Sequence, residues 1–160
     1  MPGLVIRPVA EAELGDLHAA LVALSRDLGD THRAGVDELR AAGFGAVAAF
    51  HALIARREAA VVGAAMASPV FSTTRGAAGV YVSDLWVAAG ERGRGTGRRL
   101  LAETLRLGRA RWGAGYVRLV VYGDNAGARG FYERLGFVAN PGEQFMSLQG
   151  AAARRLVEET

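Results

Sequence analysis

A glycine- and arginine-rich segment, Glu91 to Gly97, joins two stretches of regular pattern. It follows Val80 to Val87, an apolar run with the composition of a β-strand, and precedes Arg98 to Trp112, whose leucines recur at helical spacing. At such a junction, free backbone N–H groups and the positive end of the helix dipole converge on one point, which favours a phosphate. The sequence therefore predicts a site for a phosphorylated cofactor.

Two common phosphate-binding motifs do not fit this segment. A Walker loop has Lys and then Ser or Thr around its last glycine, but the chain contains no lysine and Arg98 follows Gly97. A dinucleotide-binding fingerprint has the spacing Gly-x-Gly-x-x-Gly and an acidic residue about twenty positions later. Here Gly93, Gly95 and Gly97 are two residues apart, and Val117 stands where the acid belongs. A nucleotide hydrolase is excluded, and NAD and FAD are disfavoured.

Two motifs carry a resemblance to a known family. The pattern Arg92-x-x-Gly95-x-Gly97 resembles the acetyl-CoA-binding signature of the GNAT superfamily of N-acetyltransferases. One helix and one strand later, residues 125–137 resemble the second signature of that superfamily: Asn125-x-x-Ala128, then Phe131-Tyr132-x-x-x-Gly136-Phe137. The resemblance covers essentially the whole chain.

The resemblance implies an α/β fold in a single GNAT domain, residues 1–160. Its sheet is mixed and mostly antiparallel, with about seven strands and about four flanking helices, and it splays between the fourth and fifth strands. Hydrophobic periodicity favours helices at 11–27, 37–42, 98–112 and 125–135. It favours strands at 4–7, 50–56, 60–67, 79–87 and 116–122, a loop at 71–76, and a terminal hairpin of 137–138 with 145–148.

The resemblance also implies acetyl-CoA as co-substrate and no metal. The backbone of the strand before the loop would bond the pantetheine arm, and the backbone amides of the loop would hold the diphosphate. Asn125 matches an asparagine that contacts CoA in the family, although an ordinary helix N-cap explains it equally well. The expected cofactor-binding residues are Leu85, Trp86, Val87, Arg92, Gly93, Arg94, Gly95, Thr96, Gly97, Arg98, Asn125, Ala128 and Phe131.

Amide formation requires a neutral amine, stabilisation of an oxyanion and a proton for the departing thiolate. By resemblance, Tyr132 is the general acid; the alternative is a core tyrosine at helical spacing with its neighbours. Asp84 is the candidate base, or else an acceptor of backbone hydrogen bonds where the sheet splays. Strand alternation places Asp84 and Trp86 on one face and Ser83 and Leu85 on the other.

A narrower resemblance indicates the acceptor. The segments Phe71 to Gly76 and Gly79 to Leu85 resemble the diamine and thialysine acetyltransferase branch, but Ser83 stands where that branch has a glutamate. We therefore expect a small primary amine, such as a diamine, thialysine or an amino-acid-like amine. Acetylation of a protein N-terminus or another macromolecule, and a non-catalytic acetyl-CoA-binding sensor, are the alternatives.

Composition limits the remaining classes. Net charge is only +3, and the arginines between Arg92 and Arg118 lack interleaved stacking aromatics apart from Trp112, which disfavours a nucleic-acid surface. The chain has no cysteine, no apolar run near 18 residues and no signal-peptide pattern, so we expect a cytoplasmic protein without a membrane partner. His18, His32 and His51 lack metal-ligand spacing. A homodimer is an expectation from resemblance.

Overall fold

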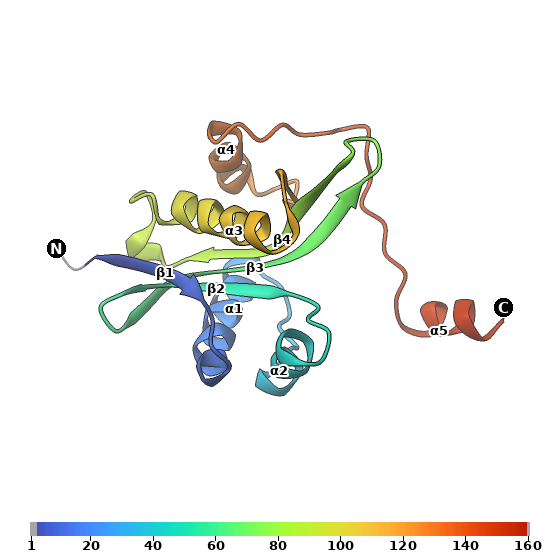
Figure 1. Ribbon diagram of the computed structural model, residues 1–160, viewed down its shortest axis with the longest axis horizontal. Helices are drawn as coiled ribbons and strands as arrows, with labels where there is room; N and C mark the ends of the chain where they lie inside the picture. The colour runs from blue at the N-terminus through green and yellow to red at the C-terminus, as the bar shows by residue number, and fades with distance from the viewer. Residues whose placement is uncertain (1–2, 160) are drawn as a thin grey trace. The chain divides into compact units, whose positions relative to one another are not determined.

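The computed structural model describes residues 3–159, which divide into two compact units. The first unit ends at Tyr122 and contains the sheet with the helices that cover it (Figure 1). The second unit begins at Gly123 and contains two short helices.

The sheet of the first unit has five strands in the order β1-β2-β3-β4-β5. Strands β1 to β4 are successive antiparallel neighbours, and β5 pairs with β4 in parallel. A parallel neighbour needs a crossover, which a helix supplies here. The strands are β1 (Leu4–Pro8), β2 (His51–Arg57), β3 (Ala60–Ser72), β4 (Ala77–Val87) and β5 (Tyr116–Leu119).

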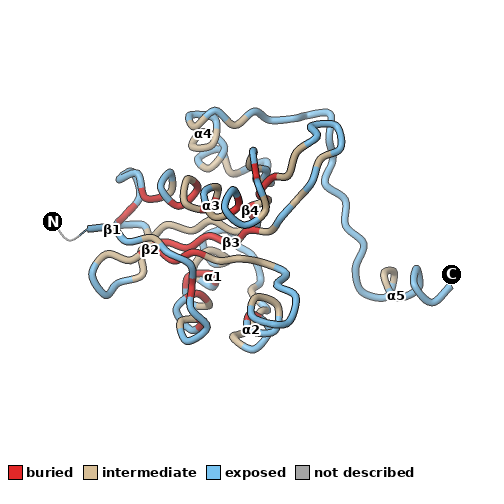
Figure 2. Tube along the Cα trace, in the orientation of Figure 1, coloured by how far each residue is buried: buried red, intermediate tan, exposed pale blue. Residues whose placement is uncertain are grey.

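Helices cover both faces of this sheet. In Figure 1, α1 and α2 lie on one face and α3 on the other. Buried residues follow the centre of the sheet and the sides of α1 and α3 that face it (Figure 2). The elements are the 3₁₀ turn η1 (Glu11–Glu13), α1 (Leu14–Leu28), α2 (Val36–Phe44), the 3₁₀ turn η2 (Ala89–Glu91) and α3 (Thr96–Trp112).

The helical spacing of leucines explains the two cores. Leu14, Leu17 and Leu21 form one stripe of α1 and are buried with Ile54 and Ala64 of the sheet. On the opposite face, Leu100 of α3 is fully buried against the cluster of Leu53, Ala55 and Ala65. The small side chains of β2 and β3 allow both helices to approach the sheet closely.

The predicted sheet of about seven strands is wrong for the described residues, which contain five strands. The terminal hairpin of 137–138 and 145–148 is absent, because residues 137–149 form no helix or strand. The turn at Asn140 does form, with the Glu143 N–H donating to the Asn140 carbonyl at 3.3 Å. A turn and two short apolar runs are compatible with a hairpin but do not impose one, since an isolated hairpin is only marginally stable.

The number of helices and the ends of two strands also differ from the expectations. The described residues form five α-helices rather than about four. The additional helix is α5 (Gly150–Glu158), which follows α4 (Ala126–Arg134) in the chain. β3 continues to Ser72, so the first two of the six residues expected as a loop at 71–76 are strand. β5 ends at Leu119 rather than at residue 122, because only Tyr116–Leu119 pair with β4. β-branched and aromatic composition predicts a strand but not how far its partner extends.

Two helical glycines should respond in opposite ways to alanine. A Cβ at Gly108 of α3 would stand 2.4 Å from Cγ2 of the buried, stiff Val80, whereas a Cβ at Gly15 of α1 meets nothing within 4 Å. We expect Gly108→Ala to lower the free energy of unfolding by about 1–3 kcal/mol through overpacking. Gly15→Ala should raise it by up to about 1 kcal/mol through helix propensity. Urea denaturation measures both, and equal effects would contradict the close approach of α3 to β4.

Candidate active site

The loop between β4 and α3 begins with η2 and turns at two glycines. Gly93 and Gly95 have φ angles of 76° and 82°, in the left-handed region that glycine adopts readily. Gly95 is also the N-cap residue of α3. A Cβ at either glycine would meet nothing within 4 Å, so backbone conformation rather than space requires glycine here.

The N-terminus of α3 has no internal partner for its amides. The first helical hydrogen bond runs from the Arg99 N–H to the Gly95 carbonyl at 3.0 Å, no side chain caps the helix, and its first turn has no acid. The N–H groups of Thr96, Gly97 and Arg98 therefore lack acceptors within the helix. Aligned amides at a helix start bind anions.

A buried carboxylate fixes the shape of this loop. Glu91, whose side chain is 5% exposed, accepts two hydrogen bonds from Arg57 of β2, at 3.2 Å from Nε and 2.5 Å from Nη2. The Thr96 hydroxyl donates to the same carboxylate at 2.8 Å. The Arg57 and Thr96 bonds lower the pKa of Glu91 from 4.5 to about 2. These three residues, the Glu91 network, join the two ends of the loop to the sheet.

Sequence reasoning placed Thr96 in the site but missed the roles of Glu91 and Arg57. Glu91 was visible as an acid at the edge of an arginine-rich loop. Its partner lies 34 residues earlier on a strand that is not a sequence neighbour, so no local spacing identifies the pair.

The exposed side chain of Arg92, the first residue of the GNAT-like motif, is hydrogen-bonded to two other elements. Its Nε donates to the Val87 carbonyl at 2.9 Å, and its Nη2 donates to Asp27 of α1 at 2.7 Å. The guanidinium thus fastens the loop to β4 and α1. Arg94 and Arg98 are exposed and have no ion pair with an acid among residues 3–159, so their charges add to the positive potential of the helix start.

The sheet opens beside this loop. Pairing of β4 with β5 ends at Val82 and Leu119, although β4 continues to Val87. From Ser83 to Val87, the β5 side of β4 therefore has no partner strand in the described chain. Backbone groups on such an edge can bond a ligand that lies along the strand. Leu85, Trp86 and Val87, assigned to pantetheine by resemblance, lie on this edge.

A β-bulge at Ser83 determines which way Asp84 faces. Met66 pairs with Asp84 and Ala67 with Val82, so Ser83 is the extra residue. Beyond the bulge, Leu85 and Val87 pack in the core under α3, while Trp86 packs in the core under α1 and α2. Asp84 shares the Trp86 face, as strand alternation predicts. Its carboxylate makes no hydrogen bond or ion pair with residues 3–159, which leaves it available to an incoming group.

The remaining predicted residues come together in the second unit, on α4. Asn125 is the N-cap of that helix, because its Oδ1 accepts from the Ala128 N–H at 3.1 Å. The Tyr132 ring contacts Phe131 and Phe137 at centroid distances of 5.2 and 5.4 Å. Burial raises the pKa of the Tyr132 phenol, which therefore stays protonated at neutral pH.

The structure thus groups the predicted residues in two sets, the loop with β4 and the start and centre of α4. No cluster of three or more His, Cys, Asp or Glu in the described chain is arranged to hold a metal ion. None of the described helices is long and apolar enough to cross a membrane.

A mixed sheet that opens beside an amide-rich helix start is an α/β arrangement suited to a phosphorylated ligand. The chain matches the model of the acetyltransferase (GNAT) family over residues 20–137. The protein therefore belongs to the GNAT acetyltransferase family, whose members use acetyl-CoA. The narrower diamine and thialysine branch is not confirmed by the comparisons.

Individual proteins are similar to this chain in part of the sequence or in the fold. N-alpha-acetyltransferase 40 of Saccharomyces cerevisiae is 42% identical over 69 residues, which are 39% of this chain and 24% of that protein. The match thus spans about a quarter of the yeast protein. An integron cassette protein from the V. cholerae mobile metagenome has a TM-score of 0.80 at 19% identity, with 99% of each chain covered. Aminoglycoside N-acetyltransferase AAC(6')-Iy, solved with CoA, has a TM-score of 0.73 at 18% identity, covering 93% of this chain and 95% of that one.

The Glu91 network should make the free energy of unfolding of the first unit depend on pH between about 2 and 5. Because the folded pKa of Glu91 lies near 2, below 4.5, its contribution is present above about pH 4.5 and is lost as pH falls toward 2. Glu91→Gln should melt at a lower temperature than the wild type at pH 7, and this gap should shrink between about pH 5 and pH 2.

Thermal unfolding across that pH range measures the gap. Glu103→Gln is the matched control, because Glu103 is a half-exposed acid that pairs with Arg106 on the surface of α3. Its melting temperature should stay close to that of the wild type. A Glu91→Gln gap that is constant with pH would show that the carboxylate charge is not what holds the loop.

Proposed function

We propose that this protein is an acetyl-CoA-dependent N-acetyltransferase that acetylates the primary amine of a small molecule. The observation that carries the proposal is the amide-rich loop between β4 and α3, shaped by the Glu91 network, next to the unpaired edge of β4. An elongated ligand with a diphosphate at one end and amide groups along its arm fits both features. Acetyl-CoA has this chemistry and supplies an activated acetyl thioester.

The residues present fit the cofactor. The amides of Gly93 to Arg98 would hold the diphosphate, with Arg94 and Arg98 adding positive charge. Arg92 would act indirectly, since its side chain is bonded to Val87 and Asp27. The backbone of β4 from Leu85 to Val87 would bond the pantetheine arm. Asn125, Ala128 and Phe131 complete the proposed cofactor residues on α4.

Asp84 and Tyr132 would move the protons. Asp84 accepts a proton from the ammonium group of the acceptor, directly or through water, because its carboxylate has no competing partner in the described chain. Tyr132 donates its phenolic proton to the sulfur that leaves. A raised pKa keeps that proton in place across the neutral range.

The acceptor we favour is a small primary amine, such as a diamine, thialysine, an amino-acid-like amine or an aminoglycoside. Ser83, where the diamine branch has a glutamate, removes one carboxylate that a polycation would use. A protein N-terminus is the second candidate, because the yeast relative of 42% identity over 69 residues is named an N-alpha-acetyltransferase. A cytoplasmic location and a homodimer stay predictions.

Thiol release from acetyl-CoA over a panel of amines tests the activity. The panel contains thialysine, lysine, diamines, spermidine, aminoglycosides and short peptides. We expect turnover with one class of small amine, and a loss of kcat of about 10²-fold or more in Tyr132→Phe and Asp84→Asn. Turnover only with peptides would favour the N-terminal alternative, and CoA binding without turnover on any acceptor would favour a non-catalytic sensor.

Binding of CoA tests the loop separately from chemistry. Arg98→Gln removes a charge at the helix start, and Gly95→Ala places a Cβ at a φ of 82°. Both should weaken CoA binding by about tenfold in calorimetry. Arg109→Gln, on an exposed position of the same helix, is the control and should bind CoA like the wild type. Equal loss in Arg98→Gln and Arg109→Gln would indicate a general charge effect rather than a specific loop.

A further inference from the structure

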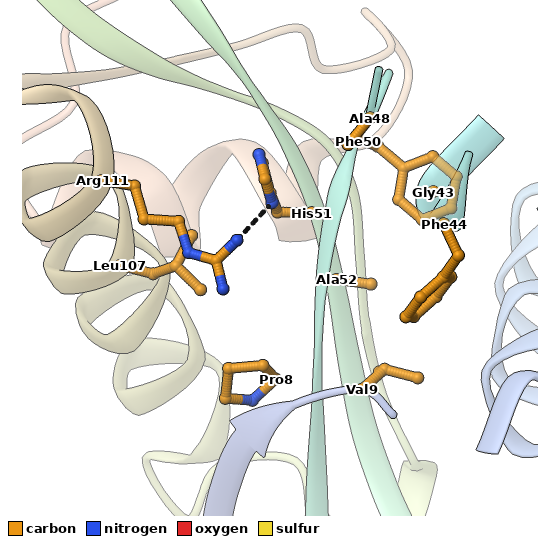
Figure 3. Close-up of a pocket in the computed structure, with 10 residues that line it drawn as sticks. All are labelled: Pro8, Val9, Gly43, Phe44, Ala48, Phe50, His51, Ala52, Leu107 and Arg111. Carbon is orange, nitrogen blue, oxygen red and sulfur yellow. Dashed lines mark hydrogen bonds between the residues drawn. The ribbon is translucent and has the colours of Figure 1, made fainter. Parts of the chain in front are cut away.

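A pocket of about 200 Å³ opens at the opposite edge of the sheet (Figure 3). It lies entirely within the first unit, and it shares no residue with the 92–98 loop or with β4. Its lining residues are Pro8, Val9, Gly43, Phe44, Ala48, Phe50, His51, Ala52, Leu107 and Arg111.

The pocket exists because β1 ends at Pro8, opposite Leu53, and leaves the first two residues of β2 without a partner in β1. Pro8 is the last residue of β1, and the ladder closes with the Val9 N–H donating to the Ala52 carbonyl at 3.0 Å. Beyond that bond, His51 has no neighbour from β1. Figure 3 shows side chains on both sides of this free edge of β2, with Phe44 and Phe50 on one side and Arg111 on the other.

Most of the lining is apolar. Two phenylalanine rings, Val9, Leu107 and two alanines contribute hydrocarbon, and no carboxylate lines the pocket. The Phe50 ring packs against the end of α2 so closely that a Cβ on Gly43 would stand 2.6 Å from it. The Phe50 side of the pocket is therefore held in place by packing.

The polar side chains of the pocket are Arg111 and His51. Arg111 Nη1 donates to Nδ1 of His51 at 3.2 Å, which requires a neutral imidazole with its proton on Nε2. The imidazole is tilted against the Trp112 ring at 5.2 Å. Burial and the Arg111 charge lower the pKa of His51, so the imidazole is neutral at physiological pH. Arg111 has no ion pair with an acidic side chain of residues 3–159.

We propose that this pocket binds a small organic monocarboxylate with an apolar body of about six carbons. An apolar cavity of about 150 Å³ holds benzene, so about 200 Å³ accommodates such a body. The guanidinium of Arg111 offers the planar pair of N–H groups that suits a carboxylate. An amine would meet an unpaired cation instead, and a free phosphate would leave the apolar lining unfilled. The site is therefore distinct from both substrate sites proposed above.

Titration of the ¹⁵N-labelled full chain by NMR tests the proposal, with hexanoate and phenylacetate as probes and hexanamide as the neutral analogue. We expect saturable shifts at residues around the pocket, with a dissociation constant on the order of 1 mM for the acids, and binding about tenfold weaker for the amide. Arg111→Gln should weaken hexanoate binding by about tenfold, because it removes a charge-assisted hydrogen bond. Arg109→Gln, two residues away on the same helix, should leave it unchanged.

A second variant separates lost affinity from lost structure. Ala48 is an exposed lining residue, so Ala48→Phe should fill the pocket while leaving the Arg111–His51 contact in place, and it should abolish the shifts. If Arg111→Gln does not fold, Ala48→Phe alone tests whether the acids bind in this pocket. Equal binding of hexanamide, unchanged binding in Ala48→Phe, shifts confined to the 92–98 loop, or no saturable shift with either acid would each overturn the proposal.

Discussion

The shape of the loop between β4 and α3 depends on one interaction, the burial of Glu91 between Arg57 and Thr96. A buried carboxylate is costly unless it is paired and hydrogen-bonded, and here both partners come from different elements. Arg57 comes from β2 and Thr96 from the first residue of α3, so the same carboxylate fixes where the chain leaves the sheet and where the helix begins. The amides that follow are thereby oriented before any ligand arrives, which reduces the ordering cost of binding.

The arginines around the loop divide into two roles that their composition does not reveal. Arg57 and Arg92 are bonded to acids and to the backbone, and they hold the loop. Arg94 and Arg98 stay exposed beside the helix start. The first two arginines fix the shape of the loop, and the other two add positive charge beside it. From the sequence alone, these two roles cannot be told apart.

The sequence predicted the elements of the first unit well, because each has a strong local pattern: the leucines of α3, the apolar run of β4, and Gly95 at the helix start. It also predicted that Asp84 shares a face with Trp86. What it could not provide were pairings between distant residues. The Glu91–Arg57 pair, the extra residue at Ser83 and the end of β5 at Leu119 all depend on where neighbouring strands stop, and local periodicity is silent about that. The expected hairpin at 137–148 was wrong for the same reason, since strand pairing is not encoded by apolar runs alone.

Unequal strand lengths explain why the first unit has two places suited to ligands. At one edge, four-residue β5 pairs with the start of eleven-residue β4 and leaves the rest of β4 open beside the 92–98 loop. At the other edge, β1 ends at Pro8, which cannot donate a ladder hydrogen bond, and leaves the beginning of β2 open beside Arg111. Helix α3 runs between these two openings, with its amides at one end and the guanidinium of Arg111 at the other. Both ends of this helix therefore present hydrogen-bond donors. Both proposed anion sites rest on these donors, although the chain carries a net charge of only +3.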